Sequence, residues 1–162
     1  MSALDIAKLL RRVGRIAETD AIATESDYAP PPALRGSVQV RHVDCGSCNG
    51  CEIELAGAFG PVYDAERYGA RLVASPRHAD VLAVTGAPTR NLAEPLRRSV
   101  DAAPRPRVVL AIGDCAAGVG AYAQGYAVVG AVADIVPVDL VVRGCPPPPD
   151  AIVAALRQVT GR

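Results

Sequence analysis

The cysteines of this 162-residue chain have the number and spacing of a site that could do chemistry. Cys48 and Cys51 form a close CxxC pair, and Cys115 and Cys145 follow far downstream as single cysteines beside glycines. A cubane iron–sulfur cluster takes four thiolates, and proteins can supply two from a tight turn and the others from elsewhere. The spacing therefore predicts one iron–sulfur cluster, which uses four of the five cysteines.

Each of these three cysteine segments follows an apolar run typical of a β-strand, at residues 38–43, 108–112 and 140–142. In a parallel α/β sheet such strands end at the same edge, and ligands bind in the loops that leave this edge. Cysteines that are far apart in the sequence can therefore meet at one point.

The residues beside the cysteines suit a cluster-binding loop. Gly46 and Gly50 allow the unusual backbone angles that a turn around a cluster needs, and they leave backbone N–H groups free to point at sulfur atoms. Pro146, directly after Cys145, removes a competing N–H group and stiffens its loop.

Two other uses of the cysteines stay open. A structural zinc ion also accepts four thiolates, but its ligands usually come as two close pairs, whereas here Cys115 and Cys145 are single cysteines after strands. A CxxC dithiol redox centre is expected at a helix N-terminus and would leave Cys115 and Cys145 without a role. The residues favour the cluster over zinc, and zinc over dithiol chemistry.

The composition predicts one domain with an aliphatic core, because half of the residues are apolar while Trp is absent and Phe occurs once. The 17 basic and 17 acidic side chains balance, which argues against a nucleic-acid binder. We expect no signal peptide and no membrane span, and hence a reducing compartment. In such a compartment five cysteines favour metal or redox chemistry over disulfides.

Hydrophobic periodicity predicts an amphipathic helix over residues 4–17, whose basic face carries Lys8, Arg11, Arg12 and Arg15. This face is either solvated or docks on a partner subunit or a membrane surface. The proline-rich stretch at residues 28–32 predicts a stiff linker, so we divide the chain into residues 1–36 and an α/β domain at residues 37–162.

Strand-like and helix-like runs alternate from residue 37 onward, which predicts an α/β fold with a doubly wound, mainly parallel sheet. Further strands are expected at residues 70–74 and 81–84, and helices at residues 54–58, 91–100 and 150–159. Asn91, with Glu94 three residues later, is the expected N-cap of the second of these helices. Asp150 lies near the expected N-cap of the last helix, and Gly161 follows its end.

Four motifs together resemble a known family. They are Ser47-Cys48-Asn49-Gly50-Cys51 with Glu54, Ser75-Pro76-Arg77-His78-Ala79-Asp80, Gly113-Asp114-Cys115-Ala116, and Gly144-Cys145-Pro146-Pro147. The family is the small subunit of membrane-bound, energy-converting [NiFe] hydrogenases, including formate hydrogenlyase, which is homologous to the 20 kDa iron–sulfur subunit of respiratory complex I. The resemblance runs from about Val38 to the C-terminus, and the CxxC in place of adjacent cysteines favours the hydrogenase branch.

The resemblance implies a flavodoxin-like fold and one [4Fe–4S] cluster on Cys48, Cys51, Cys115 and Cys145, which leaves Cys45 as the spare cysteine. The fallback is a ferredoxin-like frame that uses Cys45 together with Cys48 and Cys51. The resemblance also implies that the chain carries no complete active site of its own. It would transfer electrons between a hydrogenase-type large subunit and ferredoxin-like iron–sulfur subunits, on the cytoplasmic side of a membrane-bound complex with membrane-embedded subunits.

Two residues depart from the pattern of that family: Arg143 stands where a proline is common, and Pro148 stands where an arginine is common. Glu52 and Glu54 are either solvated residues at a helix start or handle protons at the subunit interface, and Glu54 matches the family pattern better. His42 and His78 are expected to be structural or interfacial. The loop at residues 85–90 is expected to pack against the cluster or the partner.

Overall fold

Five apolar runs form one parallel sheet in the computed structural model, which describes residues 28–162. The strands are β1 (Val38–Asp44), β2 (Ala70–Leu72), β3 (Val81–Thr85), β4 (Val108–Ile112) and β5 (Leu140–Val142). Their order in the sheet is β2-β1-β3-β4-β5. This is the flavodoxin-like order, so the predicted fold is confirmed.

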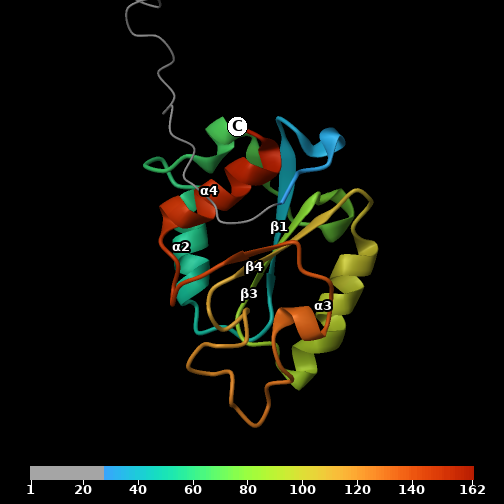
Figure 1. Ribbon diagram of the computed structural model, residues 1–162, viewed down its shortest axis with the longest axis vertical. Helices are drawn as coiled ribbons and strands as arrows, with labels where there is room; N and C mark the ends of the chain where they lie inside the picture. Colours follow the sequence, from blue (N-terminus) through green and yellow to red (C-terminus); the bar gives the residue numbers. More distant parts are fainter. Residues whose placement is uncertain (1–27) are drawn as a thin grey trace, which may run out of the picture.

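Helices cover both faces of this sheet (Figure 1). Helices α2 (Gly50–Ala58) and α4 (Pro149–Thr160) lie on one face, and α3 (Arg90–Ala102) lies on the other. Alternate residues of β3 enter the two layers: Val81 packs in the α2–α4 layer and Leu82 packs in the α3 layer. Both layers are aliphatic, as the composition predicts. The short 3₁₀ helices are η1 (Pro32–Leu34), η2 (Ala65–Tyr68), η3 (Pro76–His78) and η4 (Val132–Asp134).

The chain changes direction across the sheet at β1, because β2 lies on one side of β1 and β3 lies on the other. Open α/β sheets bind their ligands at the carboxyl ends of the strands beside such a switch point. The CxxC pair follows β1, so the fold places it at this switch point.

The bounds of all three helices differ from those predicted, and α4 (Pro149–Thr160) does so by one residue at each end. Helix α2 begins at Gly50 and not at residue 54, because Asn49 adopts a left-handed conformation (φ 70°) and the helix starts directly after it. Helix α3 is capped at Thr89, so Asn91 lies inside the first turn. Glu94 instead accepts a hydrogen bond from Arg98 at 2.9 Å. The strand predicted over residues 70–74 ends at Leu72.

The predicted helix at residues 4–17 lies outside the described residues, and the division into residues 1–36 and 37–162 stays a prediction. Of the first segment, the structure describes residues 28–36. Leu34 is buried in the α2–α4 layer, and the Gly36 N–H group donates to the carbonyl of Thr160 at 2.7 Å. None of the helices in residues 28–162 is both long and apolar enough to span a membrane.

Candidate metal centre

The turn that carries the CxxC pair is built by hydrogen bonds from the end of β1. The Asp44 carboxylate accepts the N–H groups of Gly46 at 2.8 Å and Ser47 at 2.9 Å, and Ser47 Oγ accepts the N–H group of Asn49 at 3.0 Å. Gly46 has a φ of 116°, as the sequence predicts for this turn. The prediction for Gly50 is wrong, because the left-handed residue is Asn49 and Gly50 starts helix α2.

This geometry separates the two cysteines of the pair. Cys48 lies exposed in the turn, and Cys51 lies in the first turn of α2, where its side chain enters the α2–α4 layer. A dithiol redox centre is also expected at a helix N-terminus, and the position of Cys51 agrees with this. However, an activated thiol has a lowered pKa, whereas burial, followed by the charge of Glu52, raises the pKa of Cys51 to about 11.

The two single-cysteine loops are joined directly to each other. Gly113 N–H donates to the Val142 carbonyl at 2.8 Å, and Asp114 N–H donates to the Gly144 carbonyl at 2.8 Å. The Asp114 carboxylate in turn accepts Gly144 N–H at 3.2 Å and the Arg143 guanidinium at 2.9 Å. Arg143, which departs from the family pattern, therefore bridges the loop of Cys145 to the loop of Cys115.

The four cysteines at the carboxyl edge of the sheet come together. A Cβ atom added to Gly113 would lie 2.6 Å from Cys51 Sγ, which places this sulfur against the loop of Cys115. A Cβ atom added to Gly50 would lie 3.6 Å from Cys48 Sγ and 3.7 Å from Pro146, the residue after Cys145. After burial and Glu52, the thiolate charges of Cys115, Cys48 and Cys145 also raise the pKa of Cys51, so all four lie within electrostatic range.

Cys115 also has a backbone donor at its sulfur. Burial is the main cause that raises the pKa of Cys115, and the charges of Cys145 and Cys48 act in the same direction. A hydrogen bond from the backbone of Tyr122 opposes them, because an N–H group that points at sulfur favours the thiolate. The loop after Cys115 thus returns to supply the kind of donor that iron–sulfur ligands use.

Cys45 lies apart from these four cysteines. Its side chain is 0% exposed in the α3 layer, on the other side of the sheet from Cys51. Its N–H group donates to the Thr85 carbonyl at 2.9 Å, and its carbonyl accepts Thr89 N–H at 3.0 Å. Burial, with a smaller effect from Asp44, raises the pKa of its thiol to about 12. These contacts give Cys45 the position of a core residue.

A polar network that the sequence analysis missed lies beside the CxxC turn. The Glu52 carboxylate accepts hydrogen bonds from the hydroxyls of Ser47, at 2.6 Å, and Thr85. The ring of His42 lies 2.8 Å from the Thr85 hydroxyl and 3.4 Å from Glu52. His42 is therefore structural, as predicted. The signal that could have revealed the network is the alternation of β1 and β3, which places His42 on the same face of the sheet as Thr85, the polar residue that ends β3.

The other predicted residues are not part of this cluster of side chains. Glu54 makes no hydrogen bond or ion pair within residues 28–162. His78 is exposed in η3, before the start of β3 and therefore at the opposite edge of the sheet from the cysteines. The loop at residues 85–90 packs against the CxxC turn, since a Cβ atom on Gly86 would lie 2.5 Å from Ser47 N.

The residues present fit a four-iron cluster by the chemistry of their donors: four thiols from three loops, with a backbone donor at one sulfur. Within residues 28–162 no three His, Cys, Asp or Glu side chains lie close enough to hold a single metal ion. A [4Fe–4S] cluster does not require such a group, because each thiolate binds its own iron atom.

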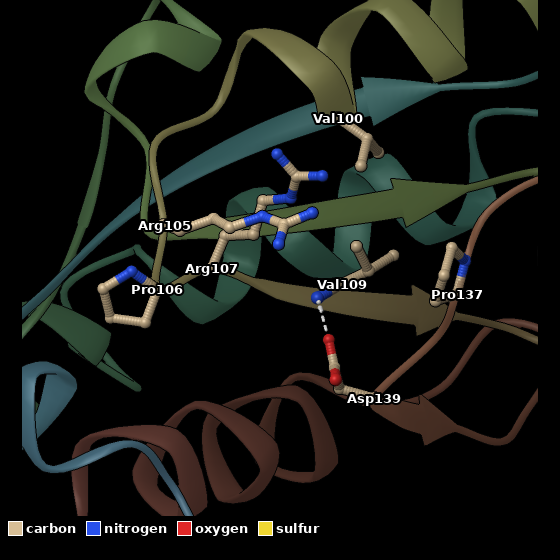
Figure 2. A pocket seen from close by; sticks show the side chains of 7 residues that line it. All are labelled: Val100, Arg105, Pro106, Arg107, Val109, Pro137 and Asp139. Carbon is tan, nitrogen blue, oxygen red and sulfur yellow. Dashed lines mark hydrogen bonds between the residues drawn. The ribbon is translucent and has the colours of Figure 1, made fainter.

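A separate open groove of about 540 Å³ lies at the opposite edge of the sheet (Figure 2). Arg105 and Arg107, just before β4, line it together with Asp139, just before β5. The Asp139 carboxylate accepts the N–H group of Val109 at 2.7 Å, which fixes this acidic side chain at the start of β4. The groove shares no lining residue with the cysteine loops.

Similar proteins include subunits of hydrogenase complexes. The chain is 43% identical over 128 residues to formate hydrogenlyase subunit 7 of Escherichia coli (strain K12), which covers 79% of this chain and 50% of that protein. It is 46% identical over 114 residues to the probable membrane-bound hydrogenase subunit MbhJ of Pyrococcus furiosus, covering 70% of this chain and 68% of that protein. The chain thus spans half the length of formate hydrogenlyase subunit 7.

Solved structures share the fold. A chain of the membrane-bound sulfane sulfur reductase, an archaeal respiratory membrane complex, aligns with a TM-score of 0.69 and 29% identity over 80% of this chain and 71% of that chain. A chain of an NAD⁺-reducing [NiFe]-hydrogenase aligns with a TM-score of 0.56 and 20% identity over 72% of this chain and 86% of that chain, a likeness of fold alone. Residues 48–159 match the family described as NADH ubiquinone oxidoreductase, 20 kDa subunit. The chain belongs to this family.

Proposed function

We propose that this chain is the electron-transfer subunit of a multi-subunit oxidoreductase of the [NiFe] hydrogenase and formate hydrogenlyase type. It holds one [4Fe–4S] cluster on Cys48, Cys51, Cys115 and Cys145. The observation that carries this proposal is the gathering of four thiols from three loops at the sheet edge, with Cys45 apart in the α3 layer. Membership of a family named for an oxidoreductase subunit supports it.

The residues of the chain have distinct tasks in this proposal. Four soft thiolates bind iron, and the Tyr122 backbone N–H group supplies a hydrogen bond to the Cys115 sulfur. Asp114 and Arg143 keep the two single-cysteine loops together. When bound, a [4Fe–4S] cluster supplies one-electron transfer. In this proposal, catalysis belongs to a partner subunit.

Exposed apolar side chains near the cysteines support a partner that covers this edge. Ile53 lies exposed two residues after Cys51, and Val119, Tyr122 and Tyr126 are exposed on the loop after Cys115, Tyr126 at 92%. Apolar groups gathered around a functional edge are typical of subunit interfaces. We propose that a hydrogenase-type large subunit covers this edge. A ferredoxin-like iron–sulfur subunit and membrane-embedded subunits complete the complex, on the cytoplasmic side of the membrane.

A complex-I-like, quinone-reducing function is the second candidate, because the matched family is described as a subunit of NADH ubiquinone oxidoreductase. The two functions differ in the large subunit. Two CxxC pairs in the copurified large subunit, one near each terminus, would identify a nickel site and the hydrogenase function. A large subunit without them would favour the complex-I-like function.

The cluster is tested by anaerobic reconstitution of the purified chain with iron and sulfide. We expect a brown protein with about four iron atoms and matching sulfide per chain. A colourless protein that binds one zinc ion per chain would instead make it a zinc-stabilised interaction module. A separate assay of the isolated chain should detect neither hydrogen evolution nor hydrogen oxidation.

A further inference from the structure

Glu52 occupies a central place beside the CxxC turn that its position in the sequence does not explain. Its carboxylate, whose side chain is 20% exposed, accepts hydrogen bonds through both oxygens. Ser47 Oγ donates to Oε2 at 2.6 Å, and Thr85 Oγ1 donates to Oε1. Glu52 is therefore tied to the turn on one side and to the end of β3 on the other.

The network continues to β1 through His42. Because the Thr85 hydroxyl gives its hydrogen to Glu52, its oxygen is left to accept a hydrogen bond from His42 Nε2 at 2.8 Å. This assigns the hydrogen of the His42 ring to Nε2, an assignment made from the network. Thr85 is fully buried, so its hydroxyl needs these partners. The residues beside Cys48 and Cys51 are thus fixed to the two central strands.

The negative charge of Glu52 lies beside both cysteines of the pair. Glu52 directly follows Cys51 in α2, and its Oε2 accepts the hydroxyl of Ser47, the residue before Cys48. Both hydroxyl donors are neutral, so the network leaves the charge of the carboxylate in place. A fixed negative charge beside a cluster favours its oxidised state over its more negative reduced state.

We propose that Glu52 is a positioning residue that holds the CxxC turn against β1 and β3, and that its charge lowers the reduction potential of the cluster. This inference rests on the proposed function. It assigns to Glu52 a role that involves no proton transfer.

The test compares the full-length reconstituted chain with Glu52→Gln, which keeps the shape of the side chain and removes its charge. In Glu52→Gln we expect at least a threefold higher ratio of reduced to oxidised cluster at a fixed potential, which is about 30 mV for a one-electron couple. We also expect loss of iron to a chelator to be at least about threefold faster, since Gln keeps only one acceptor for the two hydroxyls. Glu54→Gln is the matched control and should change neither quantity.

Glu52→Gln with the wild-type potential and wild-type iron release would overturn the proposal, as would an equal shift in Glu54→Gln. If Glu52→Gln cannot be loaded with a cluster, Thr85→Val decides, because it removes a donor and leaves the carboxylate. Faster iron release from Thr85→Val then supports the positioning role, and wild-type release overturns it. A wild-type chain that takes up no cluster contradicts the proposed function and this inference together, whereas a loaded wild type with an unchanged Glu52→Gln contradicts only the inference.

Discussion

Gly113 is the residue at which one added methyl group should disturb the candidate metal centre most directly. It follows β4 with a φ of 95°, and a Cβ atom there would lie 2.6 Å from Cys51 Sγ. The carbonyl of Gly144 and the ring of Pro147 stand next, at 3.6 and 3.8 Å. We therefore predict that Gly113→Ala destabilises the metal-free chain and lowers its capacity for a cluster.

The expected loss in the free energy of unfolding has two parts. A residue with a Cβ atom at positive φ costs about 1–2 kcal/mol. The close contact between the added methyl group and Cys51 lowers the free energy of unfolding by a further 1–3 kcal/mol, roughly, which is the usual cost of overpacking a filled interior. The sum of about 2–5 kcal/mol is a large part of the 5–15 kcal/mol, roughly, by which domains of this kind are stable. The chain should still fold, but with a displaced Cys51 sulfur.

The assay is urea denaturation of the metal-free variants, followed by circular dichroism, with iron content after reconstitution as a second readout. Gly161→Ala is the matched control for the backbone term, since Gly161 has a φ of 69° but its nearest neighbour for a Cβ atom is Arg35 Cγ at 3.9 Å. It should lose only about 1–2 kcal/mol and keep full iron binding. Gly50→Ala, with Cys48 Sγ at 3.6 Å, should change stability by less than about 1 kcal/mol.

Equal stability and equal iron content in Gly113→Ala and Gly161→Ala would refute this reasoning. Such a result would mean that the Cys51 sulfur does not lie against the loop of Cys115.

Three further predictions concern other parts of the chain. Arg143→Ala should lower the free energy of unfolding in urea by no more than about 1 kcal/mol, because its ion pair with Asp114 is solvent-exposed, with side chains 58% and 28% exposed; a larger loss would contradict this. The pKa of Cys45 is raised from 9.0 to about 12, so the folded chain holds this proton more tightly than the unfolded chain. The free energy of unfolding should then fall between about pH 9 and pH 12, less steeply in Cys45→Ala, and an equal slope in both chains would refute the buried thiol. Deletion of residues 1–27 should leave the urea unfolding transition and iron binding unchanged but release the chain from copurifying subunits; loss of the fold would instead make this segment part of the core.

The strands β4 and β5 could be predicted to the residue, because polar residues or glycine bound their apolar runs: Arg107 and Gly113 for β4, and Asp139 and Arg143 for β5. The start of α2 could not, since it depends on the left-handed φ of Asn49 and not on hydrophobic periodicity. Local sequence signals also misplaced the cap of α3. Asn91 has the residue type of a cap, but the bridge between Thr89 and Val128 fixes the chain two residues earlier.

The convergence of the four cysteines could be predicted because topology alone brings the carboxyl ends of parallel strands together. The contacts that organise them could not. Thr85 and Glu52 are 33 residues apart, and Arg143 after β5 reaches Asp114 after β4. Such pairs depend on the register of the sheet, which no local pattern encodes. The placement of Cys45 in the α3 layer depends on that register in the same way.

The most direct test of the central claim is the iron content and the electron paramagnetic resonance signal of the reduced protein, measured for each of the five single Cys→Ser variants after identical reconstitution. We predict that the variants of Cys48, Cys51, Cys115 and Cys145 each lose the [4Fe–4S] signal, and that the Cys45 variant keeps it. Cys45→Ala serves as a second variant, because it buries no hydroxyl group in the α3 layer. Loss of the signal in both Cys45 variants, with retention in Cys115→Ser or Cys145→Ser, would contradict this assignment in favour of a ferredoxin-like frame.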